Sequence, residues 1–88
     1  MPTISMFYGI LVRMFFAPKE HNPPHIHTYY QGKIAVFDIQ HGNLITGEMP
    51  LRQTRLIPAW IEIYREELLA NWELCQNGER PFTIKPLN

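Results

Sequence analysis

Short runs of β-branched and aromatic residues fill the first half of the chain, and polar, Gly and Pro positions interrupt them, which is typical of strands. The runs cover residues 3–8, 10–16, 25–30, 34–39 and 44–49. The first two runs form two strands or one long bent strand, with Gly9 as a turn, a bulge or a point of close approach. Short polar segments separate the last three runs, so the middle of the chain is predicted to be an antiparallel meander.

The hydrophobic period changes in the second half of the chain to steps of three and four residues, which predicts one apolar stripe on a helix. The stripe consists of Ile57, Trp60, Ile61, Tyr64, Leu68, Trp72 and Cys75. Pro58 lacks an N–H and crowds the carbonyl of Thr54, so the main helix begins near Pro58 or a preceding turn meets it at a kink. Asn77 and Gly78 form a C-terminal stop. Residues 80–88 either lie along the body or add an edge strand.

The two patterns together predict an α+β fold. We expect an antiparallel sheet of four or five strands, with the long C-terminal helix packed on one face through the stripe from Ile57 to Trp72. The 88 residues are enough for a single domain over residues 1–88, and a hydrophobic content of 45% supports a core.

Composition excludes several classes of protein. One cysteine, Cys75, rules out an intramolecular disulfide and a Cys-based zinc site, and it favours a reducing, cytoplasmic location. The apolar opening, residues 4–16, is shorter than the roughly 20 residues of a membrane span and contains Arg13, so we interpret it as buried sheet. Eight Lys and Arg balance eight Asp and Glu, so any contact with nucleic acid has to be local.

Three of the four histidines gather around a double proline, in His21-Asn22-Pro23-Pro24-His25-Ile26-His27. The two prolines restrict the backbone that leads into the third strand. Because side chains alternate along a strand, His25 and His27 are predicted to share one face of the sheet, together with Tyr29.

Asp38 is unusual because it lies at the end of an apolar run, where a carboxylate needs a partner. A two-residue loop at Gln31-Gly32 places His25 opposite Asp38, and a loop at Gly32-Lys33 places His27 there. A three-residue loop places Ile26 opposite Asp38 instead, with its side chain on the other face.

Three interpretations of this cluster remain open. In the first, Asp38 orients one of His25 and His27, and the two rings act as an acid–base pair that cleaves RNA without a cofactor. In the second, His25 and His27, with or without His21, bind a divalent metal, with Asp38 as a ligand or its support. In the third, these side chains only satisfy one another on a half-exposed sheet.

Other candidate binding residues lie outside the cluster. Arg52 and Arg55 precede the apolar stripe, where free backbone N–H groups also favour an anion such as phosphate. Solvated arginines paired with surface carboxylates are the commoner arrangement. Tyr29 is suited to stack a base or donate a proton, although packing is the usual role of a strand tyrosine.

The chain resembles a known bacterial family. The start Met1-Pro2-Thr3-Ile4-Ser5, the block from Glu20 to His27 and the helical segment from Arg65 to Leu74 carry the resemblance to DUF4160, a family of unknown function. It implies a small intracellular protein, often encoded beside a second small protein and suspected of forming toxin–antitoxin-like pairs. The family block maps onto His21, Pro23, Pro24, His25 and His27.

Two hypotheses of function follow. The first is a toxin-like component that acts on RNA through His25 and His27, with Asp38 as orienter and Arg52 or Arg55 as phosphate contact. The second is a non-catalytic module that binds a partner protein encoded nearby, through a sheet edge or the histidine face. Neither requires a membrane, and both are compatible with a homo-oligomer. Convergence of the histidines and Asp38 in a cleft favours the first, and burial of these side chains beside an exposed apolar edge favours the second.

Overall fold

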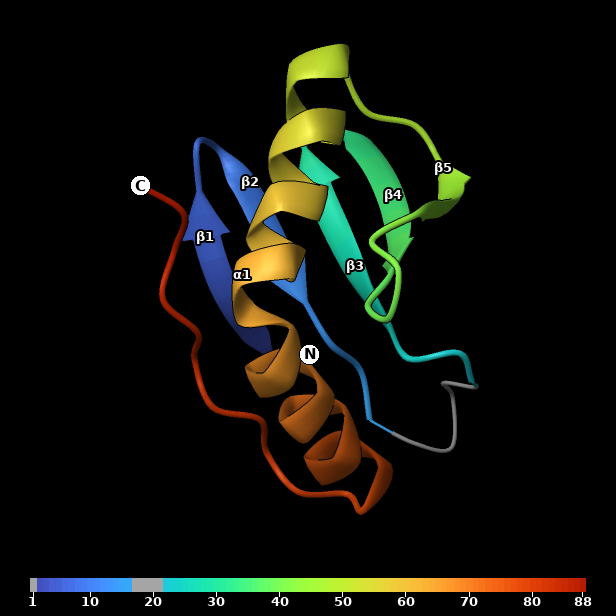
Figure 1. The fold of residues 1–88 in the computed structure, drawn as a ribbon, viewed down its shortest axis with the longest axis vertical. Coiled ribbons are helices and arrows are strands. Elements are labelled where there is room, and N and C mark those ends of the chain that lie inside the picture. The colour runs from blue at the N-terminus through green and yellow to red at the C-terminus, as the bar shows by residue number, and fades with distance from the viewer. Residues whose placement is uncertain (1, 17–21) are drawn as a thin grey trace.

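The computed structural model describes residues 2–16 and 22–88, with five strands followed by one long helix (Figure 1). The strands are β1 (Thr3–Phe7), β2 (Ile10–Arg13), β3 (His25–Tyr30), β4 (Lys33–Asp38) and β5 (Leu44–Gly47), and the helix is α1 (Leu51–Gln76). The strands form one antiparallel sheet in chain order, β1-β2-β3-β4-β5. The predicted α+β fold is confirmed.

Two tight turns of the same kind set the register of the sheet. Tyr8 and Gly9 join β1 to β2, and Gln31 and Gly32 join β3 to β4. All four residues have positive φ, at 48°, 78°, 46° and 81°, as a type I′ hairpin turn requires. The Gln31-Gly32 loop pairs Tyr30 with Lys33, which selects the first of the predicted registers.

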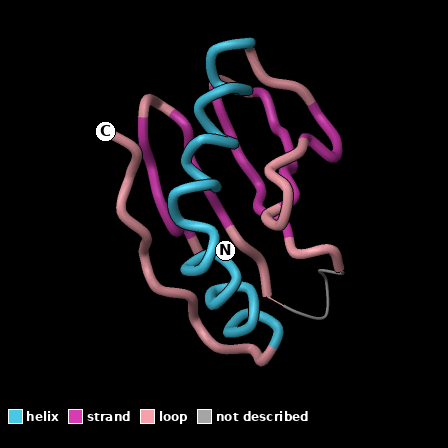
Figure 2. Tube along the Cα trace, in the orientation of Figure 1, coloured by secondary structure: helices cyan, strands magenta, loops and turns pink. Residues whose placement is uncertain are grey.

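The helix covers one face of the sheet, as the ribbon and the tube both show (Figures 1 and 2). On that face Ile10, Val12, Ile26 and Phe37 are fully buried, and Trp60 of α1 packs among them. Burial of a large apolar side chain stabilises the fold by roughly 1.5–3 kcal/mol. The other sheet face carries His27 and Tyr29 by strand alternation, and we call it the distal face. His25 belongs to the same alternation, but at the end of β3 its ring also reaches Trp72 of α1.

Helix α1 begins at Leu51, so the predicted start near Pro58 is wrong, and Pro58 lies inside the helix. The early turns persist because Gln53 and Ile57 are buried against the body. A departure from helical geometry does occur, but at Tyr64, with φ −112° and ψ 24°. Among the described residues, no helix is both long and apolar enough to cross a membrane.

The C-terminal segment, residues 79–88, lies beside β1 without becoming a strand (Figure 2). One backbone hydrogen bond joins the two, from Ile84 N–H to the carbonyl of Ile4, at 2.7 Å. The indole N–H of Trp60 donates to the carbonyl of Lys85 at 2.9 Å. Of the two predicted alternatives for this segment, the structure adopts the one in which it lies along the body.

Candidate functional site

The distal face is organised in rows of side chains that run across the strands. Cross-strand pairing aligns one apolar row, made of Met6, Leu11, Tyr29 and Ile34. The next row is polar in part, and it contains Thr3, Arg13, His27, Val36 and Thr46. His25 and Asp38 form a third, shorter row. The prediction that Tyr29 shares the histidine face is confirmed, whereas Tyr30 packs against the core on the helix side.

His25 and His27 lie side by side at the start of β3, both half-buried. Their ring centroids are 5.3 Å apart, with the planes at 67°. The His25 ring also lies 5.0 Å from that of Trp72, and the His27 ring lies 4.4 Å from that of Phe15, edge to face. These aromatic neighbours hold both imidazoles in place.

Backbone geometry assigns the proton of the neutral His25 ring. Nδ1 of His25 lies 2.8 Å from the carbonyl oxygen of Pro23. A carbonyl oxygen only accepts hydrogen bonds, so Nδ1 carries the proton and Nε2 is the basic nitrogen of the neutral ring. The Asn22–Pro23 peptide bond is cis. The hydrogen bond to the Pro23 carbonyl orients the His25 ring, a role that the sequence suggested for Asp38.

Asp38 lies directly opposite His25, as one predicted register requires, but its carboxylate turns toward the following turn. Oδ1 accepts a hydrogen bond from the backbone N–H of Gln40, and Oδ2 accepts one from Nδ1 of His41, each at 2.9 Å. His41 itself lies on the surface, with 70% of its side chain exposed. An aspartate two residues before a turn often bonds to the backbone in this way, so the local sequence contained a signal for this contact.

Arg13 and Phe15 were missed as candidates, and both lie beside His27. Arg13 is the cross-strand partner of His27, and its guanidinium carbon lies 5.0 Å from the centre of the Tyr29 ring. Arg13 Nε is buried and has no hydrogen-bond partner within residues 2–16 and 22–88. The sequence did contain a signal for Arg13. A charged residue inside the apolar run of β2 is costly to bury unless it interacts with a partner.

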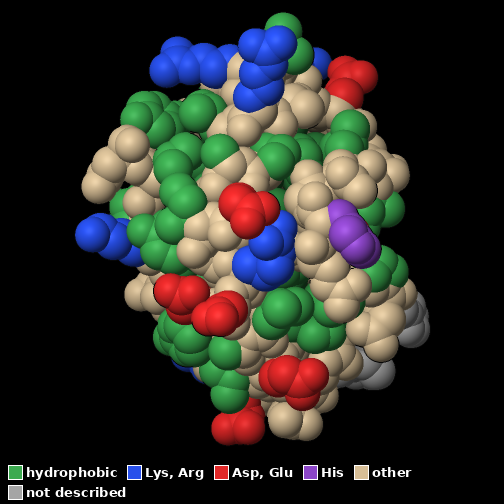
Figure 3. All heavy atoms as spheres, viewed as in Figure 1, with side chains coloured by type: hydrophobic (Ala, Val, Ile, Leu, Met, Phe, Trp, Pro, Cys, Tyr) green, Lys and Arg blue, Asp and Glu red, His purple; other side chains and the backbone are tan. Residues whose placement is uncertain are grey.

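Arg52 and Arg55 are exposed on the first turns of α1, at the opposite end of the molecule from the histidines. His25 contacts Trp72, which follows Arg52 by 20 residues, a helical rise of about 30 Å. The guanidinium of Arg52 lies 5.7 Å from the centre of the Tyr8 ring instead. On the helix side, basic side chains gather near the start of α1 and acidic ones over its later turns (Figure 3). The predicted combination of these arginines with the histidines does not form.

The described part of the chain brings too few metal-binding side chains together to form a site of three ligands. No group of three or more His, Cys, Asp or Glu side chains is placed there to hold an ion. His21, the third predicted ligand, lies outside the described residues.

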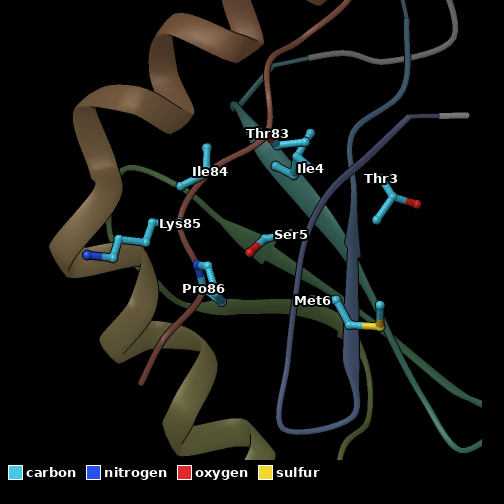
Figure 4. A pocket seen from close by; sticks show the side chains of 8 residues that line it. All are labelled: Thr3, Ile4, Ser5, Met6, Thr83, Ile84, Lys85 and Pro86. Atoms are coloured by element: carbon cyan, nitrogen blue, oxygen red, sulfur yellow. The ribbon is translucent and has the colours of Figure 1, made fainter.

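A groove of about 390 Å³ lies between β1 and the C-terminal segment (Figure 4). It is lined by Thr3, Ile4, Ser5, Met6, Thr83, Ile84, Lys85 and Pro86. The Ser5 hydroxyl is buried and has no hydrogen-bond partner among the described residues. None of the described histidines lines this groove, although it shares Thr3 and Met6 with the rows of the distal face.

The model of the family DUF4160, a domain of unknown function, matches residues 9–73 of the 88. The chain belongs to DUF4160. The matched part extends from the turn before β2 into the later turns of α1, so it includes Arg13, His25, His27 and Tyr29. No curated protein and no solved structure matches this DUF4160 chain.

Proposed function

We propose that this DUF4160 protein is the toxin-like component of a two-gene module and acts on RNA through His25 and His27. The observation that carries the proposal is the contact between the two imidazoles, with ring centroids 5.3 Å apart on the distal face. Neighbouring histidines supply both halves of acid–base catalysis when one is neutral and the other protonated. The hydrogen bond from His25 to Pro23 assigns His25 the role of base, because it leaves Nε2 as the unprotonated nitrogen of the neutral ring.

The reaction that fits such a pair is cleavage of a phosphodiester next to a ribose 2′-hydroxyl. Nε2 of His25 takes the proton of the 2′-hydroxyl, and the 2′-oxygen forms a bond to the adjacent phosphorus. The bond from phosphorus to the 5′-oxygen breaks, and protonated His27 donates its proton to that leaving oxygen. The products are a 2′,3′-cyclic phosphate and a 5′-hydroxyl. In this proposal Asp38 no longer has an orienting role, because its carboxylate bonds to Gln40 N–H and His41 in the turn after β4.

The test is induced expression in a bacterial host of the wild type and of the His25→Ala, His27→Ala double variant, with folding checked by circular dichroism. His41→Ala is the matched control, because His41 bonds to Asp38 and is not part of the His25–His27 pair. We expect growth arrest and RNA fragments with cyclic phosphate ends from the wild type and the control only. Equal arrest, or no arrest, in wild type and double variant would rule the proposal out.

A second candidate, a non-catalytic module that binds a partner protein, is supported by the edge strand β5. All four residues of β5 are exposed, and Leu44 and Ile45 retain 44% and 49% of their surface. An exposed apolar edge is suited to receive a strand of another chain. Co-expression with the product of the neighbouring gene tests it: Ile45→Lys should abolish co-purification, whereas Ile63→Lys on α1 should not.

A further inference from the structure

We propose that the distal face binds single-stranded RNA, with a base stacked on Tyr29 and a phosphate held by Arg13. This inference rests on the proposed function for its class of ligand. It adds a binding surface, the Tyr29 row and Arg13, to the histidine pair. The surface lies on the same two strands as His27, since Arg13 is opposite His27 and Tyr29 is two residues further along β3.

The apolar row through Tyr29 is open at both ends. Met6 on β1 and Ile34 on β4 retain 64% and 53% of their surface, and Leu11 and Tyr29 lie between them. Four neighbouring strands extend over about 14 Å. A row of this kind, with an aromatic ring inside it, offers flat apolar surface to unstacked bases.

The positive charge of Arg13 is suited to bind an anion. No carboxylate among the described residues lies within ion-pair distance of Arg13, whereas Lys33, His41 and Arg65 each have one. The guanidinium lies over the Tyr29 ring at 5.0 Å, which fixes its plane while N–H groups at its edge can donate to phosphate. A half-buried cation of this kind, beside a stacking ring, matches a phosphate next to its base.

Base stacking on the sheet requires an unpaired strand. The bases of a duplex are already stacked and paired, and their faces do not reach a protein surface. Because Arg13 is the one phosphate contact that we assign among the described residues, the binding should depend weakly on salt. Stacking accepts every base, so we expect little sequence preference.

The test is fluorescence anisotropy with labelled 2′-O-methyl oligouridylate and oligoadenylate, which the proposed reaction cannot cleave, and with an RNA duplex. Arg13→Gln and Tyr29→Leu are compared with Arg52→Gln and Tyr8→Leu. The second pair removes an equivalent cation and ring at the other end of the molecule. Tyr29→Phe retains the stacking ring.

We expect both single strands to bind and the duplex to bind more weakly. Arg13→Gln and Tyr29→Leu should each weaken binding about tenfold, Tyr29→Phe should bind as the wild type does, and the control pair should stay close to it. Loss of one phosphate contact should also reduce the salt slope by about 0.7 in Arg13→Gln.

Two results would overturn the inference: no binding of any single strand, or equal losses in the control pair. In the first case the exposed row is better explained as a surface for a protein. Failure of the proposed function is distinguishable, because it leaves RNA uncleaved while binding to these oligonucleotides still depends on Arg13 and Tyr29.

Discussion

His41 donates a hydrogen bond from Nδ1 to the carboxylate of Asp38, across 2.9 Å. The bond closes the turn after β4, where the backbone N–H of Gly42 also donates to the carbonyl of Asp38 at 2.8 Å. Asp38 therefore stabilises a turn, although its backbone is aligned with His25 in the sheet. Asp38 is thus paired with His25 in the strand register, while its carboxylate bonds to Gln40 and His41 of the turn.

Replacement of Asp38 separates a structural role from a catalytic one. Asp38→Ala leaves Gln40 N–H and His41 without their acceptor, so we expect the free energy of unfolding to fall by about 1–3 kcal/mol. RNA cleavage by the folded variant should change far less than in His25→Ala. Urea unfolding and a cleavage assay on the same preparation measure both. A cleavage defect as large as that of His25→Ala would show that Asp38 takes part in the reaction.

Asn71 fastens the C-terminal segment to α1. Its side chain is fully buried, Nδ2 donates to the carbonyl of Phe82 at 2.8 Å, and Oδ1 accepts from Phe82 N–H at 3.1 Å. Asn71→Ala removes both bonds and leaves a cavity, so we expect a loss of about 2–4 kcal/mol in urea unfolding. Asn77→Ala, at the exposed end of the helix, is the control and should cost much less. Similar losses in the two variants would contradict the role of Asn71.

Ser5 should tolerate the loss of its hydroxyl. Its Oγ is buried without a hydrogen-bond partner in the described part of the chain, and such a group carries a desolvation penalty. Ser5→Ala should therefore leave thermal stability unchanged or raise it slightly. Thr28→Val is the contrast, because the Thr28 hydroxyl donates to the carbonyl of Ala35 at 2.7 Å. A clear destabilisation by Ser5→Ala would indicate that a water molecule or ligand in the groove bonds to Oγ.

Glu62 makes part of the stability dependent on pH. Two hydrogen bonds from Arg65, at 3.0 and 3.1 Å, and its positive charge lower the pKa of Glu62. Because the folded pKa is depressed, the pair stabilises the fold above the unfolded pKa of Glu62 and stops doing so as pH falls through the folded pKa. Thermal unfolding of Glu62→Gln should show a slightly lower midpoint than wild type at neutral pH, and the gap should close in acid. A gap that is constant with pH would contradict this.

Local patterns predicted much of the fold. Alternation along residues 25–30 and the three- to four-residue period of α1 are properties of neighbouring positions, so they identify strands, helix and buried faces directly. The choice between His25 and His27 opposite Asp38 was different. The two registers differ by two residues and leave every side chain on the same face, so the hydrophobic pattern cannot separate them. The turn at Gln31-Gly32 decided it.

At the start of α1, tertiary packing overrides the local effect of a proline. Pro58 disfavours the turn before it, but burial of Gln53 and Ile57 keeps that turn helical. The free energy of these contacts depends on residues far away in the chain. A short stretch of sequence around Pro58 does not include these distant residues, so it cannot predict the contacts.

The sequence by itself determined the α+β class, an antiparallel sheet of four or five strands, the apolar stripe of the helix and the shared face of His25, His27 and Tyr29. Only the tertiary structure decided that Arg13 and Phe15 lie beside His27, and that Arg52 and Arg55 lie at the other end. Short-range periodicity fixes which way a side chain points. Its neighbours across the sheet depend on how distant strands align and on the length of the helix, which only the packed chain defines.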